Sequence, residues 1–170
     1  MKETKLLGTI ITSDLSWWEN TNYLCKKGYQ RMAIIRKLYE FNVPVVDLVQ
    51  IYTLFIRSIL EFNSCVWNFN LTQEQSNDLE RVQKVSCKII LKEQYTSYHT
   101  ALQLLDLKEL SKRRIDLCTK FAKKCVKKER SSSMFPVDET RHGQKYKVNF
   151  AKHSRLLNSA IPQMQRILNE

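Results

Sequence analysis

Apolar residues recur along most of this chain at three- and four-residue intervals, the spacing of one face of an α-helix. The first such stretch runs to about Leu38, and it places five small or apolar residues along one side: Leu24, Gly28, Met32, Ile35 and Leu38. Before it, Ser16-Trp17-Trp18-Glu19 fits a capping box, in which the serine side chain accepts from a first-turn N–H and the glutamate reaches back. We expect a helix from about Trp17 to Leu38.

The second stretch, from about Val45 to Glu61, is apolar nearly all round. Pro44 stands where a first helical residue would, with its φ already suited to a helix. The polar residues fall in one narrow arc: Asp47, Gln50, Arg57 and Glu61. A helix with so narrow a polar side is typical of the centre of a core, so we expect Phe55 to be buried there.

Further helices are predicted downstream. Thr72-Gln73-Glu74-Gln75 is a second capping box, and it opens a helix to about Lys92. A short helix is expected near 97–105, and a longer one over about 108–128 with these residues inward: Leu110, Leu117, Phe121 and Cys125. Residues 130–145 read as a loop, 146–149 as a short strand, and a last helix begins near Ala160. At the other end, Leu6 to Ile11 read as one short strand.

These elements predict an all-α fold of about five helices with a short N-terminal strand and a C-terminal helical extension. With Gly 3 and Pro 3, the composition excludes collagen-like, turn-dense all-β and dinucleotide-binding classes. The longest apolar stretch is interrupted by charges, and the N-terminus lacks a signal-peptide pattern. We expect an intracellular protein, nuclear or cytoplasmic and not secreted, with these five cysteines as free thiols: Cys25, Cys65, Cys87, Cys118 and Cys125.

Charge changes this picture, because Lys+Arg 28 against Asp+Glu 17 gives a net charge of +11. Such a domain typically meets a polyanion, nucleic acid first. Two predicted helices carry basic stripes: Arg81, Lys84, Lys88 and Lys92 on one, and Arg113, Lys120, Lys124 and Lys127 on the other. On the premise that no Glu partner at i, i+4 neutralises these stripes, we expect them to contact phosphates; a merely solvated helix surface is the alternative. Membrane binding is not expected, since these helices bury their apolar sides.

Catalytic chemistry is not indicated. Two-metal nucleotidyl transfer needs converging carboxylates, and the six aspartates stand apart in the sequence: Asp14, Asp47, Asp78, Asp106, Asp116 and Asp138. His99, His142 and His153 have no ligand-spaced neighbours, and Cys118 and Cys125 are better explained as core residues than as metal ligands. We predict no catalytic residue, no metal and no cofactor.

Four segments of the chain, in order, are similar to motifs of one known family. Lys5-Leu6-Leu7-Gly8-Thr9-Ile10-Ile11 with Leu15-Ser16-Trp17 is similar to an "LG…LSW" segment. Leu60-Glu61-Phe62-Asn63-Ser64-Cys65-Val66-Trp67 is similar to an "LEYxSxVW" turn, and Leu79-Glu80-Arg81-Val82-Gln83 to an "LE-R-(I/V)-Q" helix. Asn158-Ser159-Ala160-Ile161-Pro162 is similar to the usual ending of the same region. Together these segments resemble the region after the palm of jockey-like non-LTR retrotransposon reverse transcriptases.

The resemblance implies the thumb and post-thumb part of an RNA-directed DNA polymerase. It implies a post-palm strand and connector (1–16), a thumb-like three-helix bundle (17–95), post-thumb helices (96–130) and a loop with a C-terminal tail (131–170). Leu7 and Gly8 would be the edge of a primer grip, and the missing palm and fingers, with the catalytic Asp-Asp turn, would lie upstream of Met1.

The resulting hypothesis is a non-catalytic fragment that clamps an RNA–DNA or other duplex through its backbone without reading sequence. The missing palm and fingers are a further expected partner. Two alternatives stay open: a helical protein-interaction module without a nucleic-acid role, and an inert translated fragment of a decayed element.

Overall fold

A computed structural model of the chain describes residues 3–140, 143–149 and 152–169. The chain is mostly helical, as expected, and it divides into two compact units. Unit 1 comprises residues 1–62 and 71–113, and unit 2 comprises residues 63–70 and 114–170. In the described part of the chain, none of the helices combines the length and apolar composition needed to cross a membrane.

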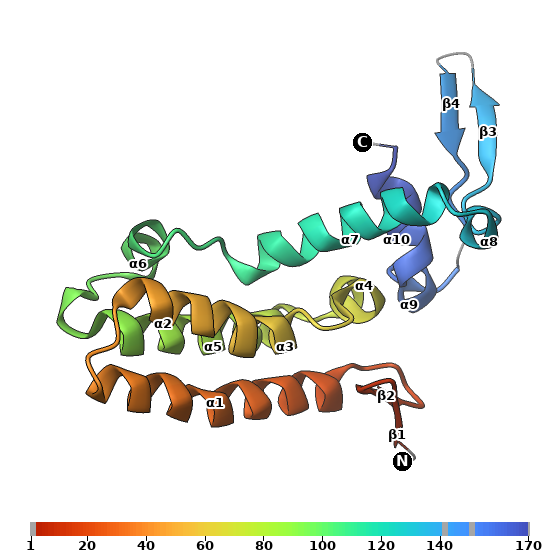
Figure 1. Ribbon diagram of the computed structural model, residues 1–170. Helices are drawn as coiled ribbons and strands as arrows, with labels where there is room; N and C mark the ends of the chain where they lie inside the picture. Colours follow the sequence, from red (N-terminus) through yellow and green to blue (C-terminus); the bar gives the residue numbers. More distant parts are fainter. Residues whose placement is uncertain (1–2, 141–142, 150–151, 170) are drawn as a thin grey trace. The chain divides into compact units, whose positions relative to one another are not determined.

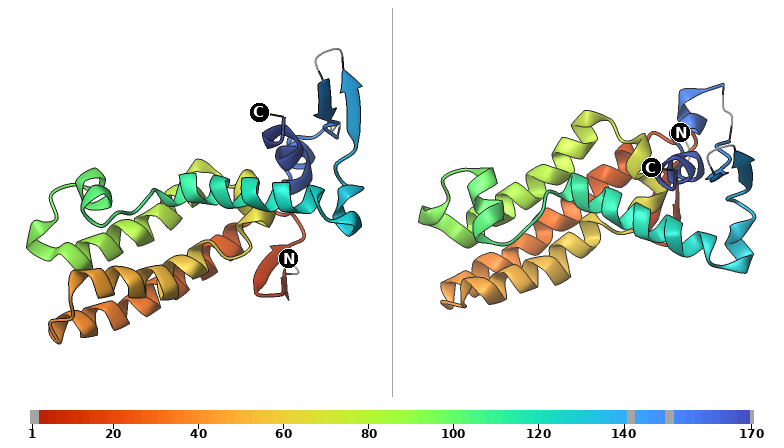
Figure 2. Two further views of the ribbon diagram at one scale, coloured as in Figure 1. Left: turned by 45° about the horizontal axis from the view of Figure 1, so that its top comes forward. Right: turned by 90° about the horizontal axis from the view of Figure 1, so that it is seen from above.

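Three long helical stretches form the body of unit 1. They are α1 (Trp18–Glu40), a continuous run of α2 (Val45–Ile51), the π-helical η1 (Tyr52–Arg57) and α3 (Ser58–Leu60), and α5 (Gln73–Leu91). The three lie alongside one another in every view (Figures 1 and 2). Gly28 permits this close packing, because a Cβ at that position would lie 2.8 Å from Cγ1 of Val82 and 3.4 Å from Cδ2 of Leu60.

The inward face of α1 is the predicted one, with Leu24, Gly28, Met32 and Ile35 buried. Its predicted capping box at Ser16 is wrong. The N-cap is Trp17, in a left-handed conformation with φ 58° and no side-chain cap. The backbone of Ser16 is engaged instead by two side chains, since its N–H donates to Asp14 and its carbonyl accepts from Nε2 of Gln75 at 2.9 Å.

The α2–η1–α3 run is not the all-round buried helix that its composition suggested. Only one face is buried, with Leu48, Tyr52, Ile56 and Leu60 each four residues apart. On the other sides, Leu54 is 62% exposed and Phe55, expected in the core, is 48% exposed. The physical reason is the number of neighbours: α1 and α5 cover one side of this helix, which leaves the opposite side to solvent.

Helix α5 begins as predicted. Thr72 is its N-cap and accepts from the N–H of Gln75 at 3.2 Å, while Oε1 of Gln75 accepts from the N–H of Thr72 at 2.8 Å. After α5 come η3 (Lys92–Gln94), the short helix α6 (Tyr98–Leu104), and α7 (Leu110–Val126), whose first turn belongs to unit 1.

The N-terminal segment is a hairpin rather than the single predicted strand. Strand β1 (Glu3–Leu6) pairs antiparallel with β2 (Thr9–Thr12), with Glu3 opposite Thr12 and Leu6 opposite Thr9. Leu7 and Gly8 form the two-residue turn, at φ 46° and 87°. Two consecutive positive φ values are what a type I′ hairpin turn needs, so the chain reverses inside the run that looked like one strand.

Unit 2 contains α4 (Ser64–Trp67), η2 (Asn68–Asn70) and α7 from Arg114 onward. It continues through α8 (Glu129–Ser132), a hairpin of β3 (Val137–Thr140) and β4 (Gly143–Tyr146), α9 (Ser154–Leu157) and α10 (Ala160–Ile167). Its core gathers around Ala122, Phe135 and Met164.

Three expectations for unit 2 need correction. Phe121, predicted inward, is 47% exposed, and its neighbour Ala122 is the buried residue. The predicted 130–145 loop contains α8 and most of the second hairpin. The strand expected at 146–149 lies three residues earlier in the chain and ends at Tyr146, while His142 lies outside the described residues.

We predict that Ile56→Ala destabilises the protein by about 2–5 kcal/mol, because Ile56 is 0% exposed and its loss leaves a cavity. The neighbouring Phe55→Ala, at a half-exposed site, is the control and should cost about 1 kcal/mol. Urea denaturation of both variants measures the difference. Equal losses, or a larger loss at Phe55, would contradict the described packing.

Candidate nucleic-acid interface

The first basic stripe lines a groove on unit 1. Arg81, Lys84 and Lys88 project from successive turns of α5, and the groove beside them has a volume of about 530 Å³. Its remaining lining residues are Asn77, Glu80, Val85 and Tyr98. Lys84 and Lys88 are exposed, so two ammonium groups meet solvent along one helical face.

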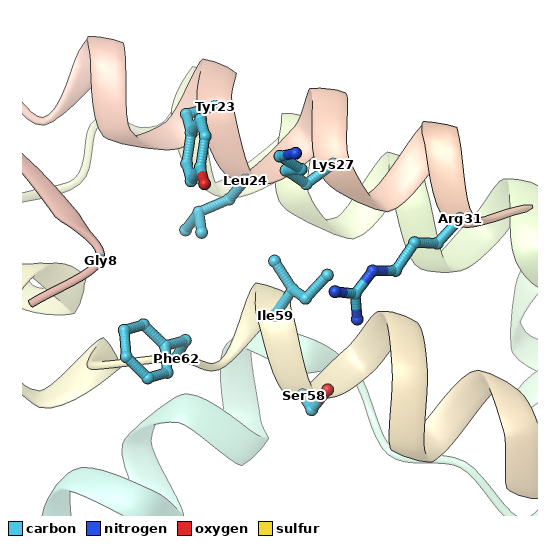
Figure 3. A pocket seen from close by; sticks show the side chains of 8 residues that line it. All are labelled: Gly8, Tyr23, Leu24, Lys27, Arg31, Ser58, Ile59 and Phe62. Carbon is cyan, nitrogen blue, oxygen red and sulfur yellow. The ribbon is translucent and has the colours of Figure 1, made fainter.

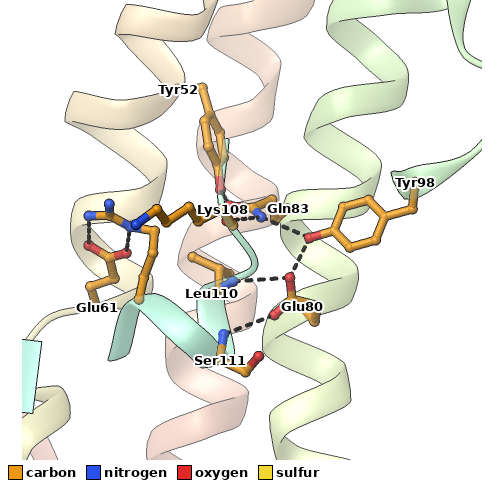
Figure 4. A network of polar contacts seen from close by, with 9 residues as sticks. Tyr52, Glu61, Glu80, Gln83, Tyr98, Lys108, Leu110 and Ser111 are labelled. Atoms are coloured by element: carbon orange, nitrogen blue, oxygen red, sulfur yellow. Dashed lines mark hydrogen bonds and ion pairs between the residues drawn. The ribbon is translucent and has the colours of Figure 1, made fainter. Parts of the chain in front are cut away.

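Glu80 is the acidic residue in this lining, and its carboxylate is occupied by internal contacts (Figure 4). Oε1 accepts from the hydroxyl of Tyr98 and from the N–H of Leu110 at 3.1 Å, and Oε2 accepts from the N–H of Ser111 at 3.2 Å. Two first-turn amides of α7, which no helical carbonyl can satisfy, thereby gain an acceptor. The carboxylate therefore caps α7.

A buried polar chain supports this arrangement. The Tyr52 hydroxyl donates to Oε1 of Gln83 at 2.6 Å, and Nε2 of Gln83 donates to the Tyr98 hydroxyl at 2.8 Å and to the carbonyl of Lys108 at 3.0 Å. Burial raises the pKa of Tyr52, and burial together with the hydrogen bond to Glu80 raises that of Tyr98. Both phenols therefore stay protonated and act as donors at neutral pH.

The other members of the first stripe have local partners. Arg81 forms an ion pair with Asp78 at 3.0 Å, which corrects the expectation that the stripe lacks acidic partners. The premise fails on the sequence as well, because Glu80 stands four residues before Lys84 and Glu109 stands four before Arg113. Because the Arg81 side chain is largely exposed, the pair contributes little and can exchange for a phosphate. Nζ of Lys88 lies 5.3 Å from the Tyr95 ring and Nζ of Lys92 lies 3.6 Å from that of Tyr39.

The second stripe is reduced by one residue. Arg113 forks onto Glu61, with Nη2 donating to Oε2 at 3.1 Å and Nε donating to Oε1. This pair joins residues 52 positions apart, so no local pattern could show it. Arg113 therefore orients the start of α7. Because its guanidinium is engaged by Glu61, its role as a phosphate contact stays a prediction. Lys120, Lys124 and Lys127 are exposed and belong to unit 2.

The predicted primer-grip edge borders a second, smaller pocket, of about 380 Å³ (Figure 3). Leu7 is 83% exposed at the tip of the hairpin turn, and Gly8 lines the pocket. The other lining residues come from α1 and from the end of the α2–η1–α3 run: Tyr23, Leu24, Lys27, Arg31, Ser58, Ile59 and Phe62.

Cations surround an aromatic ring in this pocket. Nζ of Lys5 donates to the Tyr23 hydroxyl at 3.0 Å, which lowers the pKa of Tyr23, and it lies 4.5 Å from the ring centroid. Nζ of Lys27 lies 5.9 Å from the same ring. Nη1 of Arg31 donates to the carbonyl of Phe55 at 2.8 Å.

Sequence reasoning missed Lys27 and Arg31 as candidate site residues. The available signal was their spacing, because Tyr23, Lys27 and Arg31 follow one another at four-residue intervals and share one face of α1. Their grouping with Gly8 and Phe62 depends on the hairpin and on α3, which the local pattern did not reveal.

Among residues 3–140, 143–149 and 152–169, no group of three or more His, Cys, Asp or Glu side chains is arranged to hold a metal ion. Comparisons with models of protein families, with curated proteins and with solved structures each find no match to this chain.

We predict that Glu80→Gln destabilises the protein by about 1–3 kcal/mol, because glutamine has one acceptor oxygen in place of two and cannot serve both first-turn amides of α7. Amide hydrogen exchange at Leu110 and Ser111 should accelerate in the variant. Glu93→Gln, at an exposed glutamate on η3, is the matched control and should change stability by less than about 0.5 kcal/mol. Unchanged exchange at the two amides would show that Glu80 does not cap α7.

Proposed function

We propose that the chain binds the phosphate backbone of an RNA–DNA hybrid or other duplex without reading its sequence. In this proposal it acts as the thumb and post-thumb part of a jockey-like reverse transcriptase. The observation that carries the proposal is the groove along α5, where Lys84 and Lys88 face solvent. The carboxylate of Glu80, which also lines this groove, accepts hydrogen bonds from Tyr98, Leu110 and Ser111. Such a role is exercised inside the cell, in the nucleus or the cytoplasm.

The spacing of the α5 cations suits a phosphate backbone. At a rise of about 1.5 Å per residue, Arg81 to Lys88 span about 10 Å of helix axis. Successive phosphates of one strand advance by about 3.4 Å along a duplex, so the three side chains reach about three phosphates. Lys84 and Lys88 present compact charges rather than the planar fork that reads guanine, so their contacts position the duplex and carry no sequence information.

The pocket beside Leu7 and Gly8 supports the same proposal. An aromatic ring flanked by cations is a common arrangement for nucleic-acid binding, since the ring stacks on a base or sugar while the cations hold phosphates. Tyr23 with Lys5 and Lys27 supplies both groups. The proposal assigns this pocket to the end of a strand, in keeping with the primer-grip edge that the resemblance implies.

Polymerase activity is not proposed for the chain by itself. We predict no template-dependent product in a primer-extension assay with Mg²⁺ or Mn²⁺, because two-metal transfer requires converging carboxylates. Addition of a separately expressed palm and fingers part of a related element is the informative comparison. Extension by the chain alone would contradict this prediction.

Removing four exposed lysines tests the binding proposal. We change Lys84, Lys88, Lys120 and Lys124 to Gln. The magnitude of the negative slope of log K against log salt concentration should fall by up to about 3 to 4, since each phosphate contact contributes about 0.9 on B-form DNA. Glutamine keeps the length and helix propensity, so circular dichroism should be unchanged. The measurement is a titration of several duplex sequences at a series of salt concentrations, and all sequences should be affected alike.

A control variant with the same loss of charge distinguishes direct phosphate contacts from a general effect of the net charge. Lys26, Lys37, Lys145 and Lys147 are exposed and lie outside both stripes. Their change to Gln removes the same four charges and should leave the slope nearly intact. If both quadruple variants lose affinity equally, binding follows the net charge of the chain and the assignment to the stripes is wrong.

Exposed apolar side chains favour the alternative of a protein-interaction module. Leu7, Leu54 and Phe62 are among the large apolar residues that unit 1 exposes. An interaction module predicts that random duplex binds weakly and without salt dependence, whereas a partner protein binds in high salt. Salt-insensitive, weak duplex binding by the unmodified chain would therefore make this alternative the leading one.

A further inference from the structure

Two of the five free cysteines lie against each other in unit 2. Cys65 is on α4 and Cys118 is in the middle of α7, and a hydrogen bond joins the two thiols. The Ser64 hydroxyl also hydrogen-bonds to both. Cys118 is fully buried, whereas Cys65 is half-buried and can be approached from solvent.

The packing around the pair holds the two segments together. Cys65 packs against the core cluster of Ala122, Phe135 and Met164, and Ala122 lies one helical turn after Cys118. Arg114, one turn before Cys118, is 1% exposed, and its Nε donates to Oδ1 of Asn68 at 2.8 Å. Its charge attracts the negative charge that develops on the Cys118 sulfur.

The two thiols differ in reactivity. The hydrogen bond from Cys118 lowers the pKa of Cys65 to about 7, while the same hydrogen bond and burial raise the pKa of Cys118. Because the thiolate is the nucleophile, Cys65 is reactive near neutral pH. Burial raises the pKa of Cys87 to about 12, so that thiol is inert under the same conditions.

We propose that Cys65 and Cys118 form a reversible disulfide when the protein meets a small-molecule disulfide oxidant such as oxidised glutathione. The Cys65 thiolate attacks one sulfur of the oxidant, whose S–S bond breaks and releases one thiolate. The Cys118 sulfur, having lost its proton, then attacks the Cys65 sulfur and expels the second thiolate. The pair loses two electrons and two protons, and the oxidant becomes two thiols.

The spacing of the cysteines in the sequence does not mark this pair. Cys118 and Cys125 stand seven residues apart on one helix, about 10 Å along its axis, which exceeds the separation of about 7 Å that a disulfide can bridge. Cys65 and Cys118 are 53 positions apart in the chain, and only the folding of α4 onto α7 brings them together. The new bond would tie α4 to α7 within unit 2.

Peptide mapping of the intact chain without reduction tests the proposal. The reduced protein is incubated at pH 7.5 with oxidised glutathione, quenched by alkylation and digested. A Cys65–Cys118 linked peptide should be the main cross-linked species, and dithiothreitol should remove it. Cys65→Ser and Cys118→Ser should each abolish it, whereas Cys87→Ser, at a buried cysteine outside the pair, should not.

Two further measurements keep the result unambiguous. Alkylation of Cys65 by iodoacetamide should rise with pH around a midpoint near 7, and Cys118→Ala should move this midpoint towards about 8.5, the ordinary thiol value. The same oxidation in denaturant should give mixed pairs. The proposal is overturned if the native protein yields the same mixture, if only glutathione adducts form, or if Cys65 pairs with Cys25 or Cys125.

Discussion

One carboxylate, that of Glu80, joins three helices of unit 1. It projects from α5, accepts from Tyr98 of α6 and caps the first two amides of α7. A buried first-turn amide without an acceptor costs about 1–3 kcal/mol, so the path of the chain from α6 into α7 depends on this group. Glu80 also lines the groove on which Lys84 and Lys88 face solvent, so one carboxylate links the packing of the helices to the proposed binding surface.

What the sequence could predict was local. The Thr72–Gln75 capping box and the inward face of α1 depend on residues three or four positions apart, and both were predicted. The failed capping box at Ser16 shows the limit of this reasoning, because Nε2 of Gln75, 59 positions away, takes the Ser16 carbonyl. Likewise, a stripe position such as Arg113 looked available until folding placed Glu61 beside it.

The burial of a side chain depends on how many helices surround its own helix, and the sequence pattern does not give that number. Apolar composition all round the α2–η1–α3 run suggested a central helix, yet composition does not say how many helices surround it. With α1 and α5 on one side, Ile56 is buried and its neighbour Phe55 is half-exposed. The pocket at Gly8 was likewise not predictable from local pattern. Lys27, Arg31 and Phe62 line one pocket only because the chain folds α1 and the end of α3 beside each other.

Several arginines of this basic chain form hydrogen bonds within the fold, whereas many of its lysines are exposed to solvent. Several arginines donate hydrogen bonds to acceptors within the fold: Arg31 to the Phe55 carbonyl, Arg113 to both carboxylate oxygens of Glu61, and Arg114 to Asn68. The exposed stripe positions of α7, by contrast, are lysines: Lys120, Lys124 and Lys127. A flexible ammonium group follows any array of phosphates, whereas a fork selects an acceptor of matching geometry. On α7, where Arg113 and Arg114 are committed to the fold, the charges left for the proposed polyanion are lysines, which discriminate least between sequences, as a backbone clamp requires.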